Sequence, residues 1–343
     1  MRTKRIAAAA AGLTMILLAA GCSSPGKSKP LAVVPTGVLR LGYLPDLADS
    51  PALVGLQLGF IGTDMGAVSL HPVSFTSTAA EAQALMRGQL DAAYLDPVTA
   101  VGIWQAEAAR GGLIKIIAGA ASGGVQFVVR RGITSVKQLN HSAVAAPPGG
   151  AQETALDWWL KQNGIKHASP RYVTMTGPYL VRAMRARRLA AAWEPAPLDV
   201  EMVAAGGRVM VNEASLWPGG QFSTAVLVIT NHYLTAHAAA VRLLLRGQLQ
   251  AERYLTTARS RAEKVVGRKL AGAASPALPA AVLARGFAQF QFTNDPLASS
   301  ILTEAQHAAA VRLIGPIQNI VGLVDLDPLD IVLKANGQQP ITS

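Results

Sequence analysis

The stretch VLRLGY at residues 38–43, followed by SPALVG at 50–55, decides the fold class of this chain. The first segment is apolar and predicts a β-strand. Ser50 and Pro51 are typical of a helix N-cap followed by the first helical position. The same order continues with strands expected at 73–75, 90–95 and 113–118. Strand, helix and strand at this spacing predict parallel strands joined by right-handed crossovers.

The pattern then starts again in the middle of the chain. Further strands are expected at 126–129, 143–146, 172–175, 189–192 and 209–211, followed by a long strand-like run at 222–230. From Tyr233 onward the pattern predicts only helices. We therefore expect an α/β protein with two lobes, a ligand cleft and a helical C-terminal tail. The expected limits are 38–128 for the first part of lobe 1, 129–221 for lobe 2, and 222–343 for the return to lobe 1.

Two extended crossings, near 125–130 and 222–230, are expected to link these lobes. In open sheets of this kind, ligands bind at the carboxyl ends of the strands. Three expected helices begin directly after strands, at Asp49-Ser50, at 76–78 and at 149–152. Their free N–H groups predict an anion site if they face one cleft. The alternative is that each turn only caps its own helix, as the capping-box spacing from Thr78 to Glu81 indicates.

Acidic residues also fall at the predicted strand ends, namely Asp49, Asp96, Glu153 and Glu194. Each fits an ordinary cap or a solvated charge. If Asp96 or Glu194 faces the cleft, the ligand should carry a cation as well, as an amino-sulfonate zwitterion does. The residues expected to line the ligand site are Tyr43, Ser50, Ser77, Thr78, Asp96, Gly150, Gln152 and Glu194.

Catalytic motifs are missing from the sequence. There is no Gly-x-Ser-x-Gly, no His-Glu-x-x-His and no Walker loop, and the six histidines form no triad or metal pattern. Cys22 is the only cysteine, which excludes an intrachain disulfide and a cysteine metal site. We therefore expect a protein that is not an enzyme and needs no cofactor or metal.

The N-terminus predicts export. A basic segment at 1–5 and an apolar segment at 6–20 precede LAAGC at 18–22, which looks like a bacterial lipobox. A membrane-spanning helix needs roughly twenty apolar residues, and this stretch is shorter. We predict a lipoprotein signal peptide at 1–21, then lipidated Cys22 and a flexible tether at 22–37. The chain would then lie outside the cytoplasm, anchored to the cell membrane through its lipid.

The net charge of +11 raises the question of nucleic-acid binding. The Lys and Arg residues are scattered, and their densest local cluster lies at 182–188, without interleaved aromatic residues or a nucleic-acid motif. We interpret them as solvated surface charges with some attraction for anions, and we expect no nucleic-acid partner.

The chain resembles the substrate-binding lipoproteins of the nitrate, sulfonate, taurine and bicarbonate ABC importers. The stretches that carry the resemblance are 39–43 with 50–55, DAAYLDP at 91–97, GAASGG at 119–124, LWPGG at 216–220 and FTNDPLASS at 292–300. The resemblance implies the type II periplasmic-binding-protein fold, closure of two lobes on a small solute, and an ABC permease as partner. We further expect a monomer.

Two departures from the family pattern bear on the ligand. Relatives often have Tyr-x-Gly-Pro-Asn-Pro where this chain has YLDPVT at 94–99, and Trp-x-Pro-Glu-Pro-Trp where it has WEPAPL at 193–198. Such changes usually accompany a different ligand or a lost one. The expected solute is small and anionic or zwitterionic, such as a sulfonate, taurine or nitrate. The alternatives are a non-transport lipoprotein that serves as a sensor or interaction module, and a relative that binds or makes a pyrimidine precursor.

Overall fold

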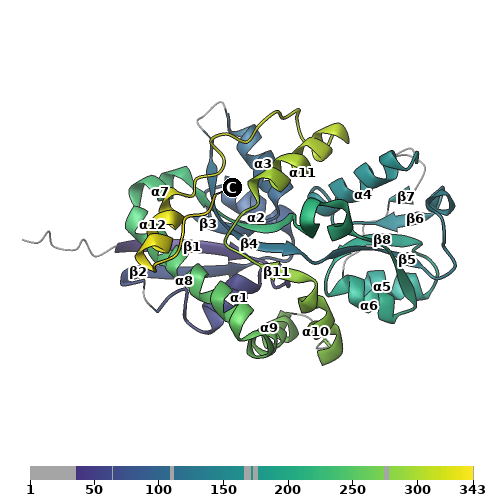
Figure 1. The fold of residues 1–343 in the computed structure, drawn as a ribbon, viewed down its shortest axis with the longest axis horizontal. Helices are drawn as coiled ribbons and strands as arrows, with labels where there is room; N and C mark the ends of the chain where they lie inside the picture. Colours follow the sequence, from purple (N-terminus) through teal and green to yellow (C-terminus); the bar gives the residue numbers. More distant parts are fainter. Residues whose placement is uncertain are drawn as a thin grey trace, which may run out of the picture. The chain divides into compact units, whose positions relative to one another are not determined.

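The computed structural model describes residues 36–63, 65–108, 112–165, 171–172, 177–273 and 278–342, and Figure 1 shows their arrangement. In these ranges, six strands form a first sheet in the order β11-β4-β10-β3-β1-β2. Their bounds are β1 Thr36–Tyr43, β2 Ala67–Ser74, β3 Ala92–Leu95, β4 Ile114–Gly123, β10 Ser223–Thr230 and β11 Phe290–Phe292. Strand β1 pairs in parallel with β2 and β3, whereas β10 runs antiparallel to β3 and β4.

A second sheet contains five strands of the described chain in the order β7-β6-β8-β5-β9. Their bounds are β5 Val125–Arg130, β6 Ala143–Ala145, β7 Arg171–Tyr172, β8 Ala191–Pro195 and β9 Gly207–Asn212. Strand β6 pairs in parallel with β7 and β8, and β5 pairs antiparallel with β8 and β9. The predicted α/β class, with parallel strands in both sheets, is therefore confirmed.

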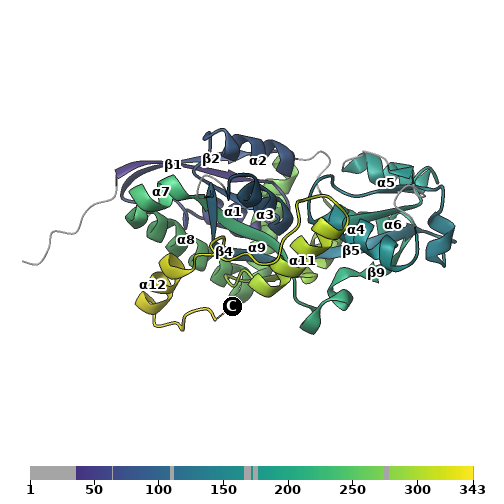
Figure 2. The ribbon, with the colours of Figure 1, turned by 90° about the horizontal axis from the view of Figure 1, so that it is seen from above.

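The helices cover the faces of both sheets (Figures 1 and 2). Their bounds are α1 Ser50–Gln57, α2 Thr78–Met86, α3 Pro97–Ala106, α4 Ala151–Gln162, α5 Pro178–Arg185, α6 Leu198–Ala204, α7 Asn231–Ala236, α8 Ala238–Thr257, α9 Arg259–Ala273, α10 Ala280–Ala288, α11 Ala298–Ala310 and α12 Asp327–Ala335. Helix α4 packs on one face of the second sheet, and α5 and α6 pack on the other.

Strand β10 shows how the first sheet is buried on both faces. Ala225, Leu227 and Ile229 face a core shared with α1 and α8. The intervening Val226 and Val228 face a second core, which contains side chains of α2, α3 and α11. This alternation follows from the two-residue period of a strand. A strand that is buried at every position and apolar at 225–229, as β10 is, is therefore typical of the centre of a sheet.

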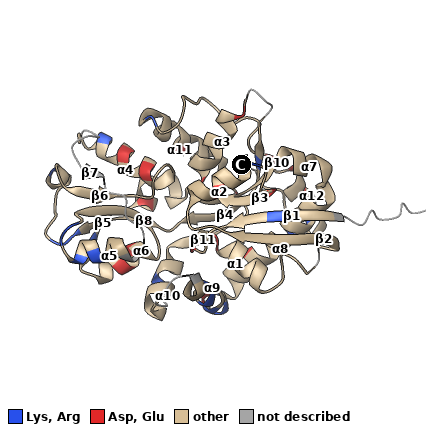
Figure 3. Cartoon of the chain, turned by 180° about the vertical axis from the view of Figure 1, so that it is seen from behind, with Lys and Arg blue, Asp and Glu red and all other residues tan. Residues whose placement is uncertain are grey.

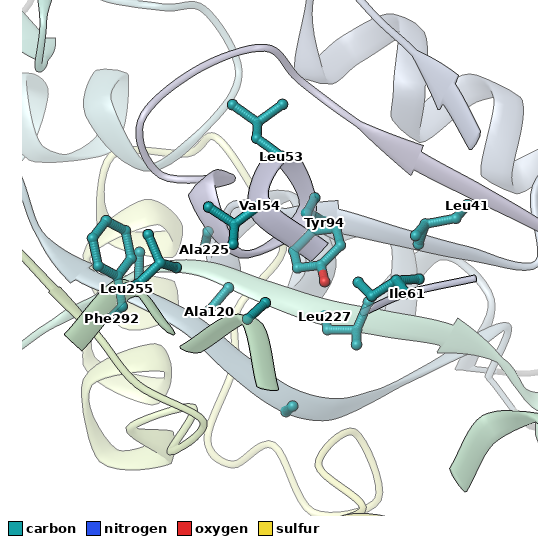
Figure 4. Close-up of a cluster of buried hydrophobic side chains, with 14 of the residues drawn as sticks. Leu41, Leu53, Val54, Ile61, Tyr94, Ala120, Ala225, Leu227, Leu255 and Phe292 are labelled. Atoms are coloured by element: carbon teal, nitrogen blue, oxygen red, sulfur yellow. The ribbon is translucent and has the colours of Figure 1, made fainter. Parts of the chain in front are cut away.

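The core between the first sheet and α1 and α8 is packed with apolar side chains (Figure 4) and also contains the polar pair Tyr94 and Gln248. Leu41, Leu53 and Leu227 are almost fully buried there, and each such side chain contributes about 1.5–3 kcal/mol. Among them, the Tyr94 hydroxyl donates to Gln248 Oε1 at 2.6 Å. The Gln248 amide in turn donates to the Gly119 carbonyl at 3.0 Å. Both buried polar groups are thus hydrogen-bonded, as burial requires.

The chain changes sheet directly after β4. Gly123 and Gly124 have φ of +80° and +79°, a conformation that glycine adopts readily. A Cβ on Gly124 would lie 2.1 Å from the Phe290 ring, so the close approach also requires glycine. The return runs through 3-10 helices at Glu213–Leu216 and Pro218–Gly220. The two segments predicted as crossings form β5 and β10, and the changes of sheet lie just before them.

The prediction of helices alone after Tyr233 is wrong at one point. Phe290–Phe292 forms β11, which pairs antiparallel with β4 at the edge of the first sheet. Three residues are too few for a periodic pattern to stand out in the sequence. No helix in the described ranges is long and apolar enough to cross a membrane. The predicted signal peptide and Cys22, with the tether up to residue 35, lie outside those ranges.

Candidate functional site

A cavity of about 310 Å³ lies between the two sheets. The first sheet contributes the loop after β1, the β2–α2 and β3–α3 junctions, and part of β10. The second sheet contributes the β6–α4 and β8–α6 junctions and the start of α5. The volume equals that of about ten water molecules and falls at the small end of ligand pockets. We call this space the inter-sheet cavity.

Local capping places the polar groups of the first sheet at this cavity. Ser77 is the N-cap of α2, where its hydroxyl accepts from Ala80 N at 3.3 Å. The predicted capping box from Thr78 to Glu81 is wrong, because the cap lies one residue earlier and the Glu81 carboxyl accepts no hydrogen bond from a described residue. Ser77 and Thr78 both line the inter-sheet cavity.

Asp96 joins two helix N-termini. It is the N-cap of α3, and its Oδ1 accepts from Thr99 N at 3.0 Å. The same oxygen accepts from Ala151 N at 3.1 Å, at the start of α4 in the second sheet. Gly150 permits this approach, because a Cβ there would lie only 3.0 Å from Asp96 Oδ2. Burial raises the pKa of Asp96, while the hydrogen bonds from Thr99 and Ala151 act to lower it.

Two further carboxylates lie in the loop after β1. Asp49 Oδ2 accepts from Leu44 N at 2.7 Å, and Asp46 Oδ1 accepts from Asp49 N at 2.9 Å. Burial raises the pKa of Asp46 to about 6. Burial, together with the neighbouring charge of Asp46, raises the pKa of Asp49 well above its usual value. Each of these carboxylates nevertheless accepts a backbone hydrogen bond.

Glu194 differs from these aspartates. It lies in β8, is 2% exposed and lines the inter-sheet cavity. No residue in the described ranges donates a hydrogen bond to its carboxyl group. Burial raises the pKa of Glu194 to about 8, and the charge of Asp199 adds to the effect. A buried carboxylate without donors is unfavourable, which is why the neutral form is preferred.

Glu81 is a second buried carboxyl group without a donor among the described residues. It lies in α2, is fully buried and is not part of the cavity lining. Burial raises its pKa to about 9, and the charges of Asp46 and Asp96 add to the effect. Glu81 therefore offers a comparison for Glu194, because both groups are buried and unpaired but only Glu194 reaches the cavity.

The eight residues expected at the ligand site fall into two groups. The structure brings five of them into the cavity lining, namely Ser77, Thr78, Asp96, Gln152 and Glu194. Gly150 lies behind Asp96. The Ser50 hydroxyl is buried and donates to Leu47 O at 2.7 Å, and Tyr43 packs against the hydrophobic core beside α1 and α8.

Other lining residues were not expected from the sequence. Asp46, Tyr94 and the stretch 195–198 line the cavity as well. The segment 195–198 directly follows Glu194 at the junction of β8 and α6 and belongs to the stretch 193–198 that departs from the family pattern, which was a usable signal. Tyr94 carried no such signal, because it lies within an apolar strand.

The charge of the cavity is the opposite of the charge of the chain. Asp46, Asp49, Asp96 and Glu194 line it, and none of its described lining residues is Lys, Arg or His. Figure 3 shows Lys and Arg on α5 and α9, outside this lining. The net charge of +11 therefore does not describe the site.

Two other possibilities were considered for a functional centre. In the described ranges, no group of three or more His, Cys, Asp or Glu side chains is arranged to hold a metal ion. A second hollow of about 570 Å³ lies between α3 and the segment after α11, and its described lining has no ionisable side chain. The inter-sheet cavity is the best candidate, because it combines strand ends with a buried carboxyl group, Glu194, that has no donor among the described residues.

Comparisons with known proteins agree with this geometry. The model of the NMT1-like family matches residues 34–268. No curated protein sequence matches the chain. The alkanesulfonate-binding protein SsuA from Xanthomonas axonopodis pv. citri, solved with MOPS, is similar with a TM-score of 0.67 and 20% identity over 84% of this chain and 98% of that one.

Two further solved structures share the fold. The nitrate-binding protein NrtA from Synechocystis PCC 6803 has a TM-score of 0.74 and 12% identity over 88% of this chain and 89% of that one. The ligand-binding component of an ABC-type import system from Staphylococcus aureus, solved with zinc, has a TM-score of 0.70 and 16% identity over 85% and 98%. The periplasmic-binding-protein fold expected from the sequence is therefore confirmed.

Proposed function

Because the chain belongs to the NMT1-like family, we propose that it is an extracytoplasmic solute-binding protein that delivers a small solute to an ABC permease. The inter-sheet cavity carries this proposal. Both sheets contribute strand-to-helix junctions to one cavity of about 310 Å³, a size suited to a small molecule. One similar solved structure is described as the ligand-binding component of an ABC-type import system, and two others as an alkanesulfonate-binding and a nitrate-binding protein, which supports the same role.

We propose that binding closes the two lobes, with limits at 38–128, 129–221 and 222–343. Support comes from the glycine pair at 123–124, which is one of two places where the chain changes sheet. Further support comes from the Asp96–Ala151 hydrogen bond, which joins the two sheets at the cavity. A ligand that contacts both sides would favour the closed arrangement over the open one.

Ser77, Thr78, Asp96, Gln152 and Glu194 are the proposed ligand-contacting residues, since their side chains line the cavity. Gly150 is proposed to act indirectly, because the absence of a side chain there lets the Asp96 carboxylate approach the start of α4. For Tyr43 and Ser50 we propose a supporting role only, because Ser50 is buried and Tyr43 packs against the hydrophobic core.

Two charge classes of solute were expected from the sequence. An anion such as nitrate or a simple sulfonate would face four carboxyl side chains and no described cation. A zwitterion such as taurine has an ammonium group that those carboxylates favour. We therefore propose a zwitterionic solute rather than an anionic one.

The location of the protein follows from its N-terminus. We propose that Cys22 is lipidated and that the folded chain is held at the cell membrane as a monomer. This proposal rests on the lipobox-like sequence at 18–22. Labelling cells with a radioactive or clickable palmitate should mark the wild-type protein and leave Cys22→Ala unlabelled.

A sensor or interaction module on the same fold is the main rival, and a pyrimidine-precursor enzyme is another. Catalysis has little support, because the sequence has no recognised catalytic motif and the similar solved structures are described as binding proteins. Transport is tested by deleting the gene and measuring uptake of the solute that the purified protein binds. Unchanged uptake would favour the sensor.

Binding itself is tested with a thermal-shift screen of small solutes, followed by small-angle scattering of the best hit. We expect one chemical class to raise Tm and to reduce the radius of gyration. A screen in which no small solute binds would overturn the proposed function.

A further inference from the structure

We propose that the solute must carry a small organic cation, such as a protonated amino group, and that Glu194 is the carboxylate that pairs with it. This inference rests on the solute-binding role proposed above and specifies the solute of the same cavity. An anionic group on the solute is optional, whereas the cation is required. Glu194 carries the argument because it is 2% exposed, lines the cavity and has no donor among the described residues.

The other acids of the cavity are already occupied by the backbone. Asp46 and Asp49 accept from the N–H groups of Asp49 and Leu44. Asp96 accepts from Thr99 N and Ala151 N. Glu194 lacks any such bond within the described ranges, so both of its oxygens are free of protein donors and can accept from a ligand. A buried acceptor left unpaired is unfavourable, and more so when it is charged, and an N–H group of a ligand would offset this cost.

Helix N-termini do not favour an anion in this cavity. Asp96 already occupies the N-termini of α3 and α4. Ser77 caps α2. The uncharged donors that remain would have to stabilise an anion beside four carboxyl groups, whereas a cation gains from every one of these groups.

An organic cation fits better than a metal ion. In the described part of the chain, no three His, Cys, Asp or Glu side chains are arranged as metal ligands. Leu44, Leu180 and Leu198 line the same cavity. These apolar side chains suit the hydrocarbon part of an organic solute, as is usual in ligand pockets.

The surroundings of Glu194 predict that binding displaces a proton. The titratable groups around it are Asp46, Asp49 and Asp96 in the lining and Asp199, which Gln289 holds at 2.7 Å. All are acids and none stabilises the ionised form. With a pKa of about 8, Glu194 is mostly protonated at pH 7 in the empty cavity. A cation favours the ionised carboxylate, so affinity should rise between pH 6 and pH 8.

The test uses the purified full chain and three compounds with one two-carbon skeleton. These are 2-aminoethanesulfonate, 2-hydroxyethanesulfonate and 2-aminoethanol, screened by thermal shift within a wider panel of amines, amidines, amino acids, sulfonates, nitrate and divalent metal ions. We expect every compound that binds to carry an organic cation and 2-hydroxyethanesulfonate not to bind. A best hit that is a pure anion or a metal ion would overturn the inference while leaving the solute-binding role intact.

Variants then test the role of Glu194. Glu194→Gln should weaken the best cationic hit at least tenfold, while Glu81→Gln, which removes a buried carboxyl group outside the lining, should change Kd less than twofold. A Glu194→Gln protein that binds the cation within twofold of wild type would overturn the assignment. If no compound in the panel binds, the proposed function falls and the inference falls with it.

Calorimetry of the same hit measures how many protons are released on binding. A purely structural role of Glu194 would not change this number. Titrations at pH 7 in two buffers of different ionisation enthalpy should show release of nearly one proton per ligand bound. Glu194→Gln should abolish that release, and Glu81→Gln should keep it. A wild-type protein that binds the cation without releasing protons would contradict the pairing.

Discussion

The two sides of the inter-sheet cavity bury carboxylates in different ways. On the first-sheet side, Asp96 accepts hydrogen bonds from the starts of two helices. On the second-sheet side, Glu194 has no donor in the described part of the chain. Burial alone therefore does not define the role of an acidic side chain. The Asp96 carboxylate receives its hydrogen bonds from within the protein and links the two sheets. The Glu194 carboxylate receives a hydrogen bond only when a solute supplies the donor.

The largest effect is expected when Glu194 is replaced, because its carboxyl group should make the free energy of unfolding depend on pH. The folded-state pKa of Glu194 is about 8, above the ordinary 4.5, so the carboxyl group destabilises the fold increasingly as pH rises from 4.5 to 8. Glu194→Gln should therefore raise the free energy of unfolding of the ligand-free protein by roughly 3–5 kcal/mol at pH 8. At pH 4.5 the variant should match wild type. Urea unfolding at both pH values measures this.

Equal stabilities of Glu194→Gln and wild type at pH 8 would show that Glu194 has an internal partner. Glu81→Gln serves as the positive control, because burial raises the pKa of Glu81 as well.

The second prediction has the opposite sign. Asp96→Ala removes the acceptor for Thr99 N and Ala151 N, and should lower the free energy of unfolding at pH 7 by about 2–3 kcal/mol. Asp96→Asn, which keeps one acceptor oxygen, should recover part of the loss. Urea unfolding measures both. A stabilised Asp96→Ala protein would remove the distinction between the two sides of the cavity.

A smaller effect is expected at Gly150. A Cβ there would lie 3.0 Å from Asp96 Oδ2, so Gly150→Ala should displace that carboxylate and lower the free energy of unfolding by about 1 kcal/mol. Gly272→Ala is the matched control, because it lies in α9 with open space around it and should be neutral or stabilising. Thermal unfolding compares the two. Equal effects on stability would mean that the position of the Asp96 carboxylate does not depend on the absence of a side chain at residue 150.

The smallest effect is expected at an ion pair in which Arg40 is exposed and Asp91 is buried. Arg40 Nη2 lies 2.6 Å from Asp91 Oδ1, but the Arg40 side chain is 40% exposed. Arg40→Met should therefore cost no more than about 1 kcal/mol, and less in 1 M salt. Urea unfolding at low and high salt checks this. A loss of stability as large as that of Asp96→Ala would mean that the exposure of Arg40 does not weaken its contribution relative to the buried hydrogen bonds of Asp96.

The sequence predicts the fold better than it predicts the site, and the reason is physical. Strands β1 and β10 contain mostly apolar runs at 38–43 and 225–229, and the starts of α1 and α2 are marked by Pro51 in the first turn and by the N-cap Ser77. Whether a hydroxyl group is buried depends on tertiary packing, and a local sequence pattern gives no information about tertiary packing. The Ser50 side chain therefore faces Leu47 although the residue lies at a strand-to-helix turn.

The unpaired state of Glu194 could not be predicted either. Its position at a strand end was visible in the sequence, but the absence of donors depends on how β8 lies against the neighbouring segments. Asp46 and Tyr94 also line the cavity but were not predicted. Asp46 lies in a loop and Tyr94 in an apolar strand, and neither setting indicates which way the side chain faces.

The position of β10 between β3 and β4 has a consequence for synthesis of the chain. Residues 223–230 fill a gap between strands made more than a hundred residues earlier, so a growing chain shorter than about 230 residues leaves two unpaired strand edges side by side. Such edges attract other chains, and distant pairing slows folding. The strand order of the first sheet can therefore be completed only after the strands of the second sheet have been synthesised.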